Sequence, residues 1–254
     1  MLGGAAKGSF TRLDLDENTF EQYYLPLAAL IRERSLDGLD LDVEEPMTLA
    51  GVIRLIDRLK LDFGKEFTIT LAPVAAALMS ERPEHNLSGF DYEALEVMRG
   101  SQISWYNTQF YCGWGDLSKT DGYDFIVARG WPADKIVIGM VTNPSNGSGW
   151  VPFEILQEVL ITLKQRYPGL GGVMGWEYFN SLPGDRAEPW KWAEWFTKNV
   201  RNGRPEVLPA PEVPVTSPLP EIKTRTPFLV VDEDTEEAEV PKTFEYHSDG
   251  LLEE

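Results

Sequence analysis

Residues 1 to 201 alternate short apolar segments of β type with longer segments of helical period, and this alternation constrains the fold most strongly. The short segments, which we predict to be strands, lie near 38–44, 67–72, 103–111, 135–141 and 171–176. Repeated strand–helix units predict a parallel β-sheet with helices packed on it, either closed into a barrel or doubly wound. A length of 254 residues with 43% apolar content suffices for one α/β barrel with a full core.

Two of the helical segments carry clear start and stop signals. In residues 48–63, Thr48 can cap the first turn, and Gly64 can adopt the left-handed conformation that ends a helix. Residues 152–167 follow the same design, with Pro152 in the first turn. Both segments place their apolar residues on one face, which predicts amphipathic helices packed on the sheet.

The chain changes character at residue 203. The segment 203–254 holds eight of the 18 prolines, and its thirteen acidic residues outnumber its four basic ones. Such a segment buries too little apolar surface to offset the entropy of ordering, so we predict a disordered acidic tail. Its one apolar island, Phe228–Val231, is the only part that we consider able to dock as a strand.

Composition excludes several partners. The formal net charge of −18 repels a phosphate backbone, so we expect no nucleic acid to bind. No run of about 20 apolar residues is present, so we expect no membrane span.

The first ten residues do not resemble a signal peptide, so we expect a cytoplasmic location for the chain as written, whereas a longer precursor could be secreted. The single cysteine, Cys112, excludes an internal disulfide and a cysteine metal cluster, and we expect no metal and no cofactor.

The most informative segment is the predicted strand 38–44, because side chains on a strand alternate between its two faces. Its odd positions are apolar and share one face: Leu39, Leu41 and Val43. Its even positions are acidic and share the other: Asp40, Asp42 and Glu44. In a barrel the acidic face points inward, where burial and like charge raise the pKa of at least one carboxyl group. A raised pKa suits a general acid, and Glu44 lies at the carboxyl end of the strand, where barrel active sites lie.

Two other structures for this segment stay open at this point. An exposed edge strand would carry the same acidic face in contact with solvent. A calcium-binding loop also uses spaced aspartates, but it needs a central glycine and a second acidic residue at a fixed distance. The apolar residues at alternate positions favour the strand.

Five segments, which follow one another along the chain at 1–10, 37–44, 70–73, 105–111 and 172–176, resemble motifs of glycoside hydrolase family 18, the chitinases and their relatives. The run Asp37-Gly-x-Asp40-x-Asp42-x-Glu44 resembles the family's signature. The other four segments resemble its third, fifth, sixth and eighth strands: 1–10, 70–73, 105–111 and 172–176. The sequences of residues 42–47 and 175–183 are most similar to those of the fungal endo-β-N-acetylglucosaminidase branch, followed by those of plant-type class III chitinases.

The resemblance implies a (β/α)8 TIM barrel that cleaves β-1,4-linked N-acetylglucosamine. The implied substrate is the chitobiose core of N-glycans, with chitin oligomers as the alternative. The family has two strands before its glycine turn, so we expect residues 1–202 to form a catalytic barrel that lacks about its first two βα units, followed by the tail at 203–254. The sheet should then be open between its first and last strands. We expect a monomer, and an inactive, lectin-like or truncated remnant is the alternative to an enzyme.

The resemblance also implies the roles of four catalytic residues. Glu44 would protonate the leaving sugar and then activate water. No second carboxylate attacks, because in this family the acetamide oxygen of the substrate is the nucleophile and forms an oxazolinium ion. Asp42 would orient the acetamide and stabilise that cation, and Asp40 would hold Asp42 through a shared proton. Tyr111 would donate a hydrogen bond to the acetamide oxygen.

Five further residues are implied in substrate binding. Asn107 and Gln109 would line the acetamide pocket, and Trp176 would form the floor under the reacting sugar. Asp37 and Gly4, from the signature and the glycine turn, complete the predicted binding residues. We expect the tryptophans of the last helical segment to serve packing: Trp190, Trp192 and Trp195.

Overall fold

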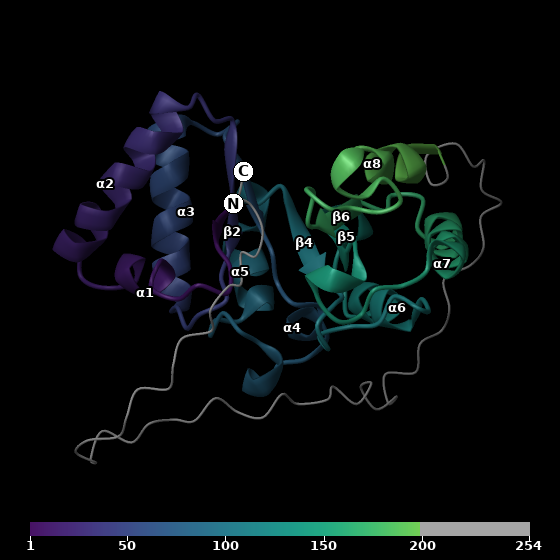
Figure 1. Ribbon diagram of the computed structural model, residues 1–254. Coiled ribbons are helices and arrows are strands. Elements are labelled where there is room, and N and C mark those ends of the chain that lie inside the picture. The colour runs from purple at the N-terminus through teal and green to yellow at the C-terminus, as the bar shows by residue number, and fades with distance from the viewer. Residues whose placement is uncertain (199–254) are drawn as a thin grey trace, which may run out of the picture. The chain divides into compact units, whose positions relative to one another are not determined.

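The computed structural model describes residues 1–198, which form a six-stranded, entirely parallel sheet with the strands in chain order (Figure 1). The strands are β1 (Leu2–Gly3), β2 (Gly38–Asp42), β3 (Thr68–Leu71), β4 (Trp105–Gln109), β5 (Ile136–Val141) and β6 (Gly172–Trp176). All five strand positions predicted from the sequence are confirmed, as is the parallel α/β class. The tail at 203–254, with its island Phe228–Val231, lies outside the described residues.

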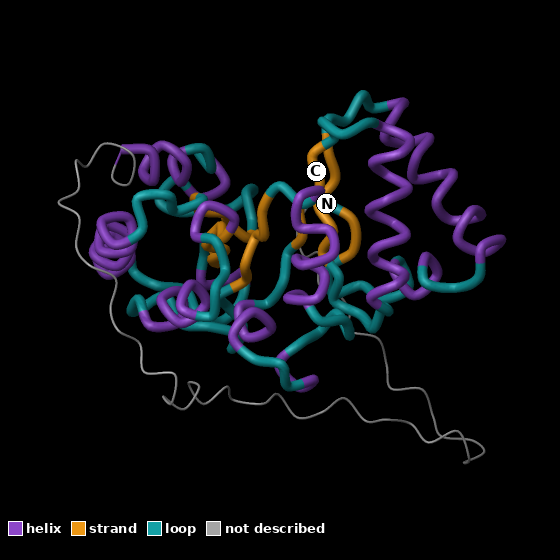
Figure 2. Tube along the Cα trace, turned by 180° about the vertical axis from the view of Figure 1, so that it is seen from behind, coloured by secondary structure: helices purple, strands orange, loops and turns teal. Residues whose placement is uncertain are grey.

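Helices connect the strands and lie around them, purple against the orange strands in Figure 2. The α-helices are α1 (Phe10–Leu13), α2 (Glu17–Glu33), α3 (Leu49–Phe63), α4 (Ala75–Met79), α5 (Tyr92–Arg99), α6 (Asp121–Ala128), α7 (Phe153–Arg166) and α8 (Lys191–Phe196). The 3-10 helices are η1 (Pro83–His85), η2 (Gly100–Gln102), η3 (Ala133–Lys135), η4 (Pro144–Asn146) and η5 (Asp185–Ala187). No helix within residues 1–198 combines the length and the apolar character that crossing a bilayer requires.

Both predicted helices form where their end signals indicate. In α3 the Thr48 hydroxyl accepts a hydrogen bond from the backbone N–H of Gly51 at 3.0 Å, and Gly64 ends the helix at φ +87°. Helix α7 begins directly after Pro152. The sequence patterns did not single out the longest helix, α2, which contains Pro26. Its start is nevertheless marked, because the Asp16 side chain accepts hydrogen bonds from two backbone N–H groups of the first turn.

The apolar face of β2 packs against the helices, as its alternation predicts. Leu41 is fully buried, and it belongs to a core cluster that also contains Leu55 and Leu59 of α3. The acidic face therefore lies on the opposite side of the sheet, away from this helix layer.

The sheet is open within the described residues. Strand β1 pairs with β2 and strand β6 pairs with β5, and neither makes a second strand pairing in residues 1–198. The predicted opening between the first and last strands is therefore present, and β2, which holds the acidic motif, has a neighbour on each side.

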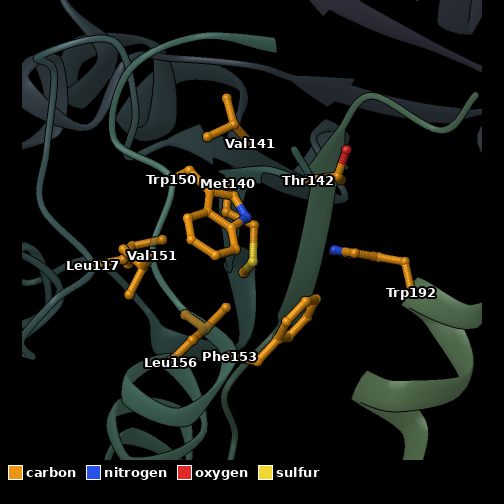
Figure 3. A pocket seen from close by; sticks show the side chains of 9 residues that line it. All are labelled: Leu117, Met140, Val141, Thr142, Trp150, Val151, Phe153, Leu156 and Trp192. Atoms are coloured by element: carbon orange, nitrogen blue, oxygen red, sulfur yellow. The ribbon is translucent and has the colours of Figure 1, made fainter. Parts of the chain in front are cut away.

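Two of the three late tryptophans serve packing, as predicted. The ring of Trp192 lies 4.4 Å from that of Phe196, and the ring of Trp195 lies 4.7 Å from that of Phe153. Figure 3 shows Trp192, Phe153 and Trp150 around a small cavity of about 10 Å³ beside β5, which has room for about one water molecule. Trp190 differs from the other two, because half of its surface is exposed.

Candidate active site

Three carboxyl groups gather at the carboxyl end of β2. Asp40 and Asp42 are the third and fifth residues of the strand, and Glu44 follows two positions later. Asp42 is only 4% exposed, while Asp40 and Glu44 are half-buried. The three acidic side chains are therefore on one face, as the alternation predicts.

Burial sets the charge state of Asp42. It raises the pKa of the Asp42 carboxyl to about 8, helped by the negative charges of Glu44 and Asp40, while the hydrogen bond from Gln109 and the chain's amino terminus act in the opposite direction. Asp42 therefore keeps its proton at neutral pH and can donate a hydrogen bond. The prediction that at least one carboxyl of this strand has a raised pKa is confirmed at Asp42.

Gln109, the last residue of β4, connects two of the three carboxyl groups. Its side-chain amide NH2 group (Nε2) lies within hydrogen-bond distance of Oδ1 of Asp42 at 3.1 Å and of Oε1 of Glu44 at 3.3 Å. It also donates to the backbone oxygen of Ala72 at 2.8 Å, which anchors the amide to the end of β3. Because Gln109 is itself buried, this amide holds Asp42 and Glu44 in a fixed relative position.

Asp40 is held by side chains of two other strands. Its Oδ1 accepts hydrogen bonds from the Thr70 hydroxyl and from Nδ2 of Asn107 at 2.7 Å. Its Oδ2 is buried and has no hydrogen-bond partner. The donors to Oδ1 come from β3 and β4. The expected shared proton between Asp40 and Asp42 stays a prediction. Thr70 was not among the predicted site residues, although its segment carried one of the motifs.

Tyr111 lies two residues beyond β4 and is 8% exposed. Burial raises the pKa of the Tyr111 phenol well above its ordinary value, and the nearby charges of Asp42 and Glu44 raise it further. The phenol therefore stays protonated and is available as a hydrogen-bond donor beside the carboxyl groups.

Trp176 is the last residue of β6 and pairs in register with Val141 of β5. The residue is 38% exposed. Its backbone oxygen accepts hydrogen bonds from the backbone N–H of Thr142 at 2.8 Å and from Nδ2 of Asn146 at 3.2 Å. The Asn146 amide also bonds the side chain of Asn180 in both directions, at 2.9 and 2.7 Å. Sequence reasoning missed this amide network, which fixes the segment that carries Trp176.

Gly4 contacts the acidic strand directly. Its backbone N–H donates to the backbone oxygen of Asp42 at 2.9 Å, and its φ of +93° suits glycine. A Cβ atom at this position would stand 3.6 Å from Oδ2 of Asp42, so the glycine backbone lies next to that carboxyl group.

Asp37 is the predicted site residue that the structure does not bring into the cluster. Its side chain is exposed, and it precedes β2 at the amino end of the strand, whereas the cluster lies at the carboxyl end. Its backbone oxygen accepts from the N–H of Thr68, so its visible role is in strand pairing. Substrate binding by Asp37 stays a prediction.

The arrangement brings together the groups that acid–base catalysis requires. Protonated Asp42, the Glu44 carboxyl, the Tyr111 phenol and the Gln109 amide converge on one end of the sheet. A half-buried carboxyl next to polar donors can exchange a proton with a bound substrate. Within residues 1–198, no group of three or more histidine, cysteine or acidic side chains is arranged to hold a metal ion.

Comparison with known proteins gives related structures over most of the described part. A fungal endo-β-N-acetylglucosaminidase from glycosyl hydrolase family 18 is 52% identical, with a TM-score of 0.75, and the match covers 79% of this chain and 71% of that one. A chitinase from Aspergillus fumigatus is 57% identical, with a TM-score of 0.69, and the match covers 77% of this chain and 70% of that one.

A curated relative supports the same relationship at greater distance. Chitinase 2 of Rhizopus oligosporus is 27% identical over 150 residues, which are 56% of this chain and 25% of that protein. The chain thus spans about a quarter of the length of this relative. No protein-family model matches the chain. The identities above 50% over more than two thirds of two solved structures confirm the family that the motifs predicted. The chain belongs to glycosyl hydrolase family 18.

Proposed function

We propose that this protein is a retaining glycosidase that cleaves β-1,4-linked N-acetylglucosamine, with Glu44 as the general acid. The observation that carries the proposal is the pair of hydrogen bonds by which Gln109 holds Glu44 next to protonated Asp42. Glu44 is half-buried, so its carboxyl can reach a leaving oxygen. It would protonate that oxygen and then take a proton from the attacking water.

The substrate's own acetamide would be the nucleophile in this reaction. Substrate-assisted members of the family form an oxazolinium ion and retain the anomeric configuration. The proton on Asp42 would let its carboxyl donate to the acetamide and orient it for attack. The protonated phenol of Tyr111 would donate to the same group, and the exposed ring of Trp176 would lie under the sugar.

The substrate class that we favour is the chitobiose core of N-glycans. The 52% identity to a fungal endo-β-N-acetylglucosaminidase supports this choice. Chitin oligomers are the second candidate, because a chitinase from Aspergillus fumigatus is 57% identical over a similar share of this chain. Both substrates present an N-acetyl group to Asp42 and Tyr111, so the catalytic residues alone do not distinguish them.

We also propose that the six strands are equivalent to the third to eighth strands of a (β/α)8 barrel. The acidic strand β2 would then be the fourth strand of that barrel, and β6 with Trp176 would be the eighth. The parallel order of the strands supports this assignment, as does the position of the acidic cluster at their carboxyl ends.

The test compares the parent chain with Glu44→Gln, which keeps the shape of the side chain but removes the acid. Mass spectrometry of a denatured high-mannose glycoprotein should show one N-acetylglucosamine left on asparagine. Glu44→Gln should reduce this release by about 10²–10⁴-fold. The control is Glu154→Gln, the same change at an exposed position of α7, which should retain parental activity.

Chitin oligomers assayed in parallel decide between the two substrates. Faster cleavage of the oligomers than of the glycoprotein would favour the chitinase alternative. Binding of either substrate by the parent without hydrolysis would support a lectin-like protein and contradict the proposed enzyme.

A further inference from the structure

Glu45, the residue after the proposed acid, is more deeply buried than Glu44 and points elsewhere. Only 3% of its surface is exposed. Its two carboxylate oxygens accept hydrogen bonds from the backbone N–H of Gly8 at 2.7 Å and of Phe10 at 2.6 Å, and a third comes from the Thr11 hydroxyl. All three donors lie in the segment that follows β1, more than thirty positions earlier in the chain.

These donors keep Glu45 charged. Burial alone would raise the pKa of its carboxyl, but the hydrogen bonds from Thr11, Gly8 and Phe10 outweigh burial and lower that pKa below its ordinary value. Hydrogen bonds to an ionised acceptor are stronger than neutral ones. Glu45 therefore attaches the segment around residues 8–11 firmly to the end of β2.

The other end of the same segment is attached beside Asp42. Gly3 pairs in register with Asp42, and the N–H of Gly4 donates to the Asp42 backbone oxygen at 2.9 Å. The chain then leaves β1 and continues into α1, in the purple part of Figure 1. The stretch from residue 4 to residue 10 is thus held at both ends by β2 and its continuation, on the side where Gly4 approaches the Asp42 carboxyl.

We propose that Glu45 is a positioning residue for the reaction: its three hydrogen bonds hold residues 4–10 against the end of β2 and so fix the wall of the site beside Asp42. This inference rests on the proposed function and assigns no chemical step to Glu45. Loss of the carboxylate would release residues 8–11 and let the wall beside Asp42 move. A shift of about 1 Å in catalytic geometry can cost about 10²-fold in rate.

The test uses two variants of this contact and one matched control. Glu45→Gln removes the charge and one acceptor with little change of shape, and Thr11→Val removes a single hydroxyl from an exposed residue. The control is Asp14→Asn, because Asp14 also accepts from a backbone N–H and a hydroxyl, both of Thr48, at 2.8 and 2.6 Å. Its partner lies at the start of α3 rather than in the segment beside Asp42.

Steady-state kinetics on the parent's best substrate should separate positioning from general destabilisation. Glu45→Gln should lower kcat by about 10- to 100-fold and change KM less than threefold. Thr11→Val should lower kcat in the same direction by a smaller factor, and Asp14→Asn should retain parental kcat even if its melting temperature falls. The proposal is overturned if Glu45→Gln and Thr11→Val, at temperatures where both are folded, keep parental kcat, or if Asp14→Asn loses as much.

Amide hydrogen exchange tests the contact independently of activity. In Glu45→Gln the Gly4 amide should exchange at least ten times faster than in Asp14→Asn, because the segment is released at its far end. If the parent hydrolyses neither substrate, the proposed function fails, and this exchange measurement alone decides whether Glu45 holds the segment. Unchanged exchange at Gly4 would overturn the inference whatever the activity.

Discussion

The raised pKa of Asp42 makes the stability of this protein depend on pH in a direction that can be tested. Its carboxyl titrates at about 8 in the folded chain, against an ordinary value of 3.8. Between these two pH values the folded state binds more protons than the unfolded chain, so the free energy of unfolding falls as pH rises. The contribution is fully present below pH 3.8 and is lost by the time the pH has passed 8.

Asp42→Asn should remove this dependence, because asparagine does not titrate. Each pKa unit corresponds to about 1.4 kcal/mol, so the stability of Asp42→Asn relative to the parent should improve by up to about 4 kcal/mol between pH 5 and pH 8. The variant should therefore compare better with the parent at pH 8 than at pH 5, although its hydrolytic activity should be low. Functional sites often contain residues, such as this buried carboxyl group, that reduce the stability of the folded protein.

Urea unfolding at pH 5, 6.5 and 8 measures the effect, with the parent and the exposed Glu154→Gln variant as references. Titrating groups that are shared by the compared proteins and lie far from Asp42 cancel in the differences, whereas Asp40 and Glu44 are coupled to Asp42 and belong to the measured effect. If the free energies of unfolding of Asp42→Asn and of the parent change with pH in parallel, the reasoning is refuted. Parallel changes would mean that Asp42 is ionised equally in the folded and unfolded states.

Three further predictions concern the site and the tail. Gln109→Leu should lower kcat by at least about tenfold, and it should move the Asp42 titration to higher pH, because the lost hydrogen bond lowers that pKa; a pH–rate profile checks both. Asp42→Asn should still turn over an oxazoline donor when it no longer hydrolyses intact glycan, and equal losses on the two substrates would contradict substrate assistance. Deleting residues 203–254 should leave the melting temperature unchanged if the tail only solubilises the chain. If Phe228–Val231 instead covers an open edge of the sheet, the deletion should lower the melting temperature by roughly 2–4 °C for each kcal/mol lost.

Features that depend on neighbouring residues in the chain were predictable from the sequence. The two-residue period of the acidic strand placed Leu41 on the helix side and Asp42 on the other. In the structure Leu41 packs in the core cluster with leucines of α3, and Asp42 contacts Gln109. The cap at Thr48 and the stop at Gly64 likewise depend on local backbone geometry. The parallel order of the strands followed from the repeated strand–helix units, because such connections are short and regular.

Features that depend on which strands become neighbours were not predictable. The sequence indicated that buried carboxyl groups must find hydrogen-bond donors, but not that Thr70 and Asn107 would supply them to Asp40. The expected shared proton between Asp40 and Asp42 stays a prediction, because these two donors bond only Oδ1 of Asp40. Glu45 was missed because its burial results from a segment more than thirty positions away, which no local pattern connects to it.

The two consecutive glutamates illustrate how one strand end can serve two purposes. Successive residues leaving a strand point in opposite directions. Glu44 therefore shares the side of Asp42, where Gln109 reaches both, while Glu45 turns to the segment after β1. The same backbone then holds a carboxyl group that must change its protonation and one whose hydrogen bonds keep it charged. This division explains why a substitution at Glu45 should disturb the reaction through geometry, while the same substitution at Glu44 should remove the proton itself.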